Sequence, residues 1–170
     1  MTGLDPALRR GKIGIVPARF GPKIVGGAEI VLRHIAEGLQ GRGWEIEILT
    51  TAATDYFAWE NDQPLGTAVE DGLTVTRFPA VKSTPGAERS ALGHRMLAGD
   101  RLTIVEQERW MNDDVRVPDL YHHLLVHAEE YRALIFGPYL FWPSYACSQV
   151  APAKSLLWTC LHDEPAAYQD

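Results

Sequence analysis

Two short segments combine residue types that could act on a phosphorylated or sugar-like ligand. Gly26-Gly27 stands directly before a long amphipathic pattern, and His162-Asp163-Glu164 follows a short apolar run. Glycines let the backbone approach a ligand closely, and the N–H groups at a helix start favour an anion such as a phosphate. A loop without a ligand is the alternative for the glycines, and a surface turn before Pro165 is the alternative for the histidine cluster.

A third candidate segment is aromatic. Tyr139, Phe141, Trp142 and Tyr145 crowd the stretch after the apolar run 131–136. Aromatic rings stack on the C–H faces of sugars, although clustered aromatic residues more often belong to a core. Both interpretations stay open at this point.

Other catalytic signatures are weak or missing. His123 and His127 lie one helical turn apart, but no H-E-x-x-H accompanies them, so we expect a solvated helix face and no metal site. The chain has no G-x-S-x-G nucleophile elbow, no G-x-G-x-x-G fingerprint and no P-loop. A Ser-His-Asp hydrolase and the two common nucleotide-binding motifs are therefore disfavoured, and no cofactor is expected.

Composition indicates a globular protein of the cytoplasm. The chain has 22 acidic and 16 basic residues, a net charge of -6, and no basic stripe of the kind that binds nucleic acid. Its two cysteines suit a bacterial or cytosolic reducing compartment. Residues 1–10 show no signal-peptide pattern, and no apolar run is long enough to span a membrane.

The candidate residues need a scaffold, and alternating strand and helix patterns supply one. Apolar runs predict strands at 12–16, 45–50, 73–78, 131–136 and 155–160, and helical spacing predicts helices at 28–40, 87–98, 101–111 and 119–129. This order predicts a single α/β domain with a Rossmann-like, doubly wound, mostly parallel sheet, the first strand central and the fourth on its opposite flank. Ligands bind such sheets beyond the carboxyl strand ends, so the loops 17–27, 137–143 and 161–165 should surround one crevice.

The segments 26–50 and 156–163 resemble the N-terminal part of the family-4 retaining glycosyltransferases. That family has a Gly-Gly loop, an amphipathic helix ending near Arg-Gly-His, and a strand ending in Thr; here Trp44 replaces the usual His. Leu156-Leu-Trp-Thr-Cys-Leu-His-Asp163 is similar to the family's strand that ends in His-Asp. Residues 80–130 add almost nothing to the resemblance.

The resemblance implies the N-terminal, acceptor-side half of a B-type fold, and a hexosyltransferase-type enzyme that moves a sugar from a nucleotide-sugar donor to a hydroxyl acceptor with retention. Gly26 and Gly27 would approach the donor diphosphate, and His162 would orient the donor sugar as the catalytic residue. The other candidates would bind the carbohydrate or other hydroxyl acceptor: Tyr139, Trp142, Asp163 and Glu164. Contact with a membrane surface is kept open as a further partner.

Two features depart from the family. Its paired glutamates lie in a C-terminal nucleotide-sugar-binding half that residues 1–170 lack, so we expect this chain to be inactive alone; Glu29 and Glu37 share the spacing by coincidence. Gly137-Pro138 stands where many relatives have a His. The alternatives are a non-catalytic sugar- or nucleotide-binding module and a nucleotide-dependent epimerase or dehydrogenase, the latter disfavoured by the missing fingerprint.

Overall fold

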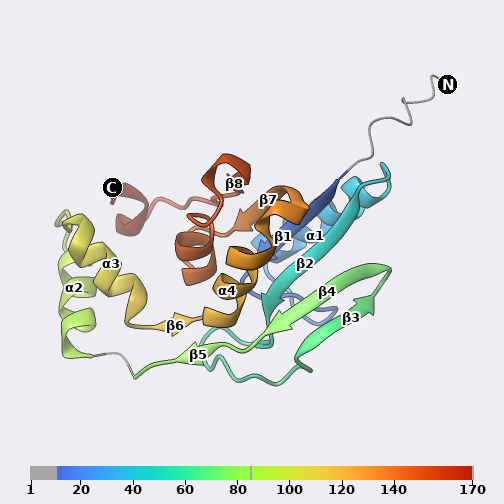
Figure 1. Ribbon diagram of the computed structural model, residues 1–170. Coiled ribbons are helices and arrows are strands. Elements are labelled where there is room, and N and C mark those ends of the chain that lie inside the picture. Colours follow the sequence, from blue (N-terminus) through green and yellow to red (C-terminus); the bar gives the residue numbers. More distant parts are fainter. Residues whose placement is uncertain (1–10, 85, 170) are drawn as a thin grey trace.

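The structure is a computed structural model that describes residues 11–84 and 86–169; the polar lead of residues 1–10 lies outside this part. Its centre is a six-stranded sheet in the order β3-β4-β2-β1-β7-β8, parallel except where β3 pairs with β4 (Figure 1). The strands span Lys12–Pro17 (β1), Glu45–Thr51 (β2), Gly66–Glu70 (β3), Leu73–Phe78 (β4), Tyr131–Gly137 (β7) and Ser155–Leu157 (β8). The predicted α/β class, Rossmann-like sheet and central first strand are confirmed.

Helix α1, Gly27–Gln40, packs on one face of the sheet. Leu32 and Ala36, four positions apart, are fully buried in a cluster with Ile13, Ile15, Ile46 and Ile48. This spacing puts both side chains on one side of the helix. The predicted helix at 28–40 is therefore confirmed.

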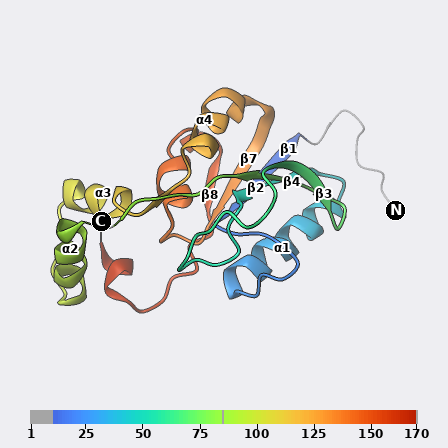
Figure 2. The same cartoon turned by 90° about the horizontal axis from the view of Figure 1, so that it is seen from below.

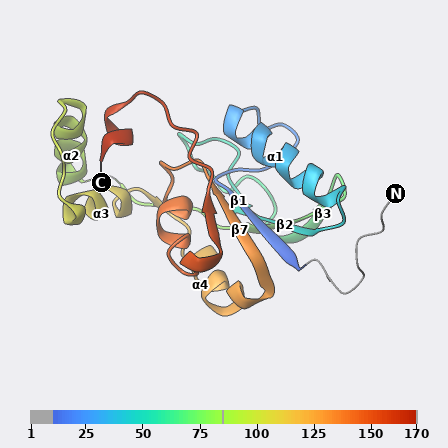
Figure 3. The ribbon, with the colours of Figure 1, turned by 90° about the horizontal axis from the view of Figure 1, so that it is seen from above.

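Helix α4, Pro118–His127, packs on the opposite face, as the two views along the sheet show (Figures 2 and 3). Pro118 occupies the first turn, where its missing N–H costs no hydrogen bond. Leu120 and Leu124 are fully buried, whereas Leu125 is exposed. Because α1 and α4 cover different faces, the winding reverses between β1 and β7.

A helical pair lies beside the sheet rather than on it (Figure 1). Helices α2, Ala87–Leu97, and α3, Ile104–Asn112, are joined to the sheet region through a short ribbon of β5, Val81–Lys82, and β6, Val115–Arg116. The pair has a small core of Leu92, Met96 and Leu102, against which Trp110 and Ala166 pack. Both predicted helices are confirmed.

The last predicted strand, 155–160, is wrong in its extent. β8 ends at Leu157, and Cys160 adopts the left-handed conformation, with φ of 50°, which breaks an extended chain. The chain then turns into a short 3-10 helix, Pro165–Tyr168, whose Ala166 packs on the α2–α3 core. No helix within residues 11–84 and 86–169 has the length and apolar character needed to cross a membrane.

Candidate functional site

The carboxyl ends of β1, β7 and β8 meet at one edge of the sheet because the three strands are parallel neighbours. The loops that carry Gly26-Gly27, the aromatic segment and His162 all leave from this edge. At the end of β7, a Cβ added to Gly137 would lie 2.7 Å from the carbonyl oxygen of Trp158. Gly137 is therefore required by the close approach of the chain after β8, which gives a structural reason for glycine at a position where the resemblance suggests histidine.

A buried ion pair that the sequence did not reveal holds the loop after β1. Arg19 and Glu29 are 7% and 8% exposed, and the Arg19 guanidinium donates to Glu29 Oε1 from Nε at 3.1 Å and from its terminal nitrogen at 2.5 Å. Arg19 also donates to the carbonyl of Thr54 at 3.0 Å, beyond the end of β2. One guanidinium thus connects three segments: the β1 loop, the first turn of α1 and the β2 loop.

This pair makes the two glycines unequal. A Cβ at Gly26 would lie 2.2 Å from a carboxylate oxygen of Glu29, whereas a Cβ at Gly27 would meet nothing within 4 Å. The first turn of α1 already holds the carboxylate of Glu29, so its positive end is partly satisfied. An additional anion would therefore have open access to the backbone at Gly27 and not at Gly26.

Tyr139 and Glu164, both candidates for acceptor binding, are brought together by the fold. The Tyr139 hydroxyl donates to Glu164 Oε1 at 2.7 Å, and the backbone N–H of Tyr139 donates to the carbonyl of Thr159 at 3.2 Å. Burial and the adjacent Glu164 carboxylate raise the pKa of Tyr139 above its ordinary value. The phenol therefore stays protonated at neutral pH and serves as a donor.

His162 and Asp163 lie on the exposed part of the same loop. Asp163 accepts a hydrogen bond from the Tyr168 hydroxyl at 2.8 Å. The imidazole of His162 is exposed and has no hydrogen-bond or ion-pair partner in residues 11–84 and 86–169. No hydrogen bond or ion pair among these residues joins His162 to Gly26 or Gly27, although their loops leave from the same sheet edge.

Trp142 does not share a cavity with Tyr139. Its indole N–H donates to Asn112 Oδ1 at 2.8 Å, and its ring lies 6.1 Å from that of Tyr121. It follows Phe141, which packs against Trp59 beside a small cavity that is also lined by Trp110 and Met111 of α3. Trp142 thus belongs largely to the packing of this region, which was the alternative interpretation of the aromatic segment.

The histidine pair on α4 belongs to a polar network at the amino ends of the strands, far along the sheet from the loops above. His123 is half-buried and shares a hydrogen bond of 3.2 Å with the Tyr131 hydroxyl, which donates to buried Glu47 at 2.8 Å. Burial and neighbouring His127 lower the pKa of His123. The expected solvated face is therefore wrong for His123. No group of three metal-ligating side chains is found in the described part of the chain.

Cys147, on the π-helical turn Pro143–Cys147, is not suited to act as a nucleophile. It is fully buried, and burial raises the pKa of its thiol to about 12, so the thiolate is not formed at neutral pH.

Comparison with known proteins gives no relative: no family model, curated protein or solved structure matches this chain.

Proposed function

We propose that this chain is the acceptor-side domain of a retaining, hexosyltransferase-type glycosyltransferase with a B-type fold. The observation that carries the proposal is the open backbone of Gly27 at the start of α1, beside the strand edge where the winding reverses between β1 and β7. Ligands of doubly wound sheets bind at this point, and the first turn of a helix favours a phosphate. The resemblance of residues 26–50 and 156–163 to the family-4 enzymes supplies the reaction class.

In this proposal, each candidate residue has a distinct role in binding the donor or the acceptor. The N–H groups near Gly27 approach the donor diphosphate, and Arg19 neutralises Glu29 so that the carboxylate repels the ligand less. His162 orients the donor sugar, and the hydrogen-bonded pair of Tyr139 and Glu164 holds an acceptor hydroxyl. The leaving diphosphate assists the incoming hydroxyl, and a second domain binds the nucleotide.

The test is His162→Ala in the enzyme that joins this domain to a nucleotide-sugar-binding half. A positioned polar group that acts in the transition state contributes about 10²-fold or more to the rate, so kcat should fall by that factor. The melting temperature should hardly change because the exposed imidazole has no hydrogen-bond or ion-pair partner to lose within residues 11–84 and 86–169. Steady-state kinetics and thermal melts on the same preparation measure both quantities.

His127→Ala is the matched control. His127 is also a partly exposed histidine, but it pairs with Glu130 at 2.6 Å near the opposite edge of the sheet. Its loss should leave kcat within about twofold of the parent, since surface pairs of this kind contribute little. A near-normal kcat for His162→Ala, or a collapse of its melting temperature, would refute the assignment of His162.

A further inference from the structure

A second candidate binding site lies between the helical pair and the sheet edge. It is a cavity of about 360 Å³, within the range of roughly 300–1,000 Å³ in which proteins hold small molecules. Helices α2 and α3 and the turn between them contribute Met96, Leu102, Trp110 and Met111, and the segments after β7 and at the end of β8 contribute Tyr145 and Leu157. The wall is therefore built from parts of the chain that are distant in sequence.

The chemistry of the wall is uniform. Of the described residues that line the cavity, none carries a charge, although charged residues make up 22% of the whole chain. The amides of Gln107 and Gln149 donate to the carbonyls of Leu102 and Tyr145, at 2.9 and 2.8 Å. Because an anion would lose its hydration here without gaining a counter-ion from the wall, the wall favours an uncharged ligand over an anionic one.

One polar group on this wall lacks a partner. Ser144 is 2% exposed, lies on the π-helical turn and lines the cavity, and its hydroxyl forms no hydrogen bond with any described residue. Buried hydroxyls are almost always hydrogen-bonded, and π-helical turns are frequent at functional sites. The hydroxyl oxygen is itself buried, so it would meet a ligand only after the Ser144 side chain rotates toward the cavity.

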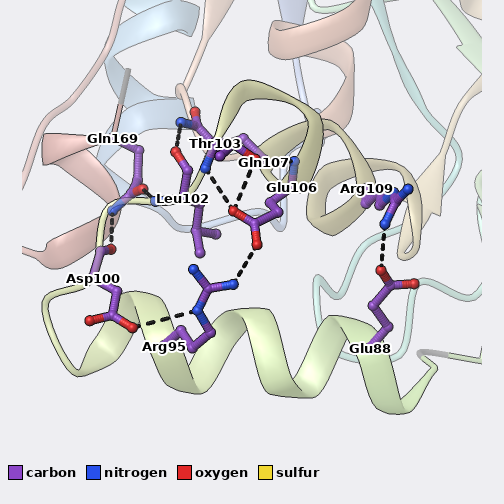
Figure 4. A network of polar contacts seen from close by, with 9 residues as sticks. All are labelled: Glu88, Arg95, Asp100, Leu102, Thr103, Glu106, Gln107, Arg109 and Gln169. Atoms are coloured by element: carbon purple, nitrogen blue, oxygen red, sulfur yellow. Dashed lines mark hydrogen bonds and ion pairs between the residues drawn. The ribbon is translucent and has the colours of Figure 1, made fainter.

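The wall formed by the helical pair is held in place by a polar network (Figure 4). Arg95 of α2 pairs with Glu106 of α3, and the Gln169 side chain accepts from the Leu102 N–H at 2.8 Å and donates to the Asp100 carbonyl at 3.2 Å. The turn between the helices is thus fixed to the chain that follows β8. A preformed cavity binds a small molecule with little cost in ordering.

We propose that this cavity binds an uncharged, largely aromatic small molecule. The indole of Trp110 and the phenol of Tyr145 offer ring surfaces for stacking, and Met96 and Met111 adapt their flexible thioethers to the ligand's outline. The lining shares one residue, Tyr139, with the acceptor candidates of the proposed function, but this proposal rests on the cavity and its lining and not on sugar transfer.

The test uses phenylnaphthylamine, an uncharged probe with one N–H donor whose fluorescence rises in apolar surroundings, titrated against the 170-residue chain. Anilinonaphthalene sulfonate has the same rings and adds a negative charge. We expect saturable binding of the uncharged probe, with an affinity about tenfold or more above that of the sulfonate.

Two neighbouring variants locate the probe. Leu157 and Leu156 are 48% and 57% exposed on the edge strand β8, but only Leu157 lines the cavity. Leu157→Arg puts a guanidinium at the wall and should weaken binding of the uncharged probe about tenfold or more, whereas Leu156→Arg should leave its affinity unchanged. Circular dichroism checks that both variants fold. The proposal fails if the uncharged probe does not bind, or if both substitutions weaken its binding equally. It also fails if the sulfonate binds to the parent chain as tightly as the uncharged probe does.

Discussion

At the scale of single residues, the Arg19–Glu29 pair decides what the glycine loop can do. Glu29 fills the space beside Gly26 and leaves Gly27 open, although the two residues are adjacent and chemically identical. A buried ion pair costs desolvation, and it is tolerated here because Arg19 also satisfies the Thr54 carbonyl. The pair therefore fixes the loop while the backbone of one glycine stays accessible.

Gly26→Ala and Gly27→Ala should consequently differ in stability. The new methyl group at position 26 displaces the Glu29 carboxylate from Arg19, which should lower the free energy of unfolding by about 1–3 kcal/mol. At position 27 it meets no atom, so the change should stay within about 0.5 kcal/mol, or stabilise the helix slightly. Urea denaturation of the chain measures both, and equal losses in the two variants would contradict the role given to Glu29.

At the scale of elements, one carboxylate links four strands. Buried Glu47 on β2 pairs with Lys12 of β1, and it accepts hydrogen bonds of 2.8 Å each from Thr76 of β4 and Tyr131 of β7. Burial by itself would raise the pKa of Glu47, but the hydrogen bonds from Lys12, Thr76 and Tyr131 outweigh it and hold the pKa below its ordinary value. Burial and the same carboxylate raise the pKa of Tyr131.

Because the pKa of Glu47 is lowered in the folded protein, the stability of the fold should decrease at acidic pH. A carboxyl whose pKa is lower in the folded state stabilises the fold above its unfolded value of 4.5, and this stabilisation is lost as pH falls through the folded value. Glu47→Gln should lower the melting temperature at pH 7 by about 5–10 °C, because Lys12 loses its buried partner and keeps only the more distant Glu130, at 3.9 Å. Between pH 7 and pH 3, the melting temperature of the variant should then decrease less than that of the parent.

The control for this prediction is Glu45→Gln, which alters an exposed residue two positions earlier on the same strand. It should leave both the melting temperature at pH 7 and its loss on acidification close to those of the parent. If Glu47→Gln shows the full acid loss of the parent, the network does not contribute to acid stability. Calorimetry or circular dichroism at both pH values gives the comparison.

At the scale of the whole molecule, the loops that carry the polar candidate residues leave from one edge of the sheet. His162 stays exposed, and no hydrogen bond or ion pair among the described residues links it to Gly26 or Gly27. An enzyme for two substrates gains several kcal/mol from holding both in position. Under the proposed function, a second domain supplies part of this positioning.

Accordingly, the 170-residue chain alone should transfer no sugar. Release of nucleoside diphosphate from a panel of nucleotide-sugars, with and without simple hydroxyl acceptors, measures this directly. Robust turnover by the isolated chain would contradict the proposal that a second domain is needed to bind the donor. Tight binding of a nucleotide-sugar without turnover would favour the stand-alone binding module instead.

The sequence alone determined the layered architecture. Apolar periodicity placed β1, β2, β4, β7 and the helices α1 and α4 close to their observed bounds, and the strand–helix order predicted a central β1. These features are local, because whether a side chain faces the core depends on its position within its own strand or helix. The same patterns showed that Gly26-Gly27 precedes a helix at the sheet edge.

Only the tertiary structure decided how the loops are arranged. Glu47 and Tyr131 meet across 84 positions, and Leu102 and Gln169 meet across 67, so no local pattern could reveal the buried network or the fixed wall of the cavity. The sequence likewise did not reveal the end of β8 at Leu157 or the turn at Cys160, because the residues between them are largely apolar. Contacts of this kind depend on the path of each loop in space, whereas periodicity records only which side of an element is buried.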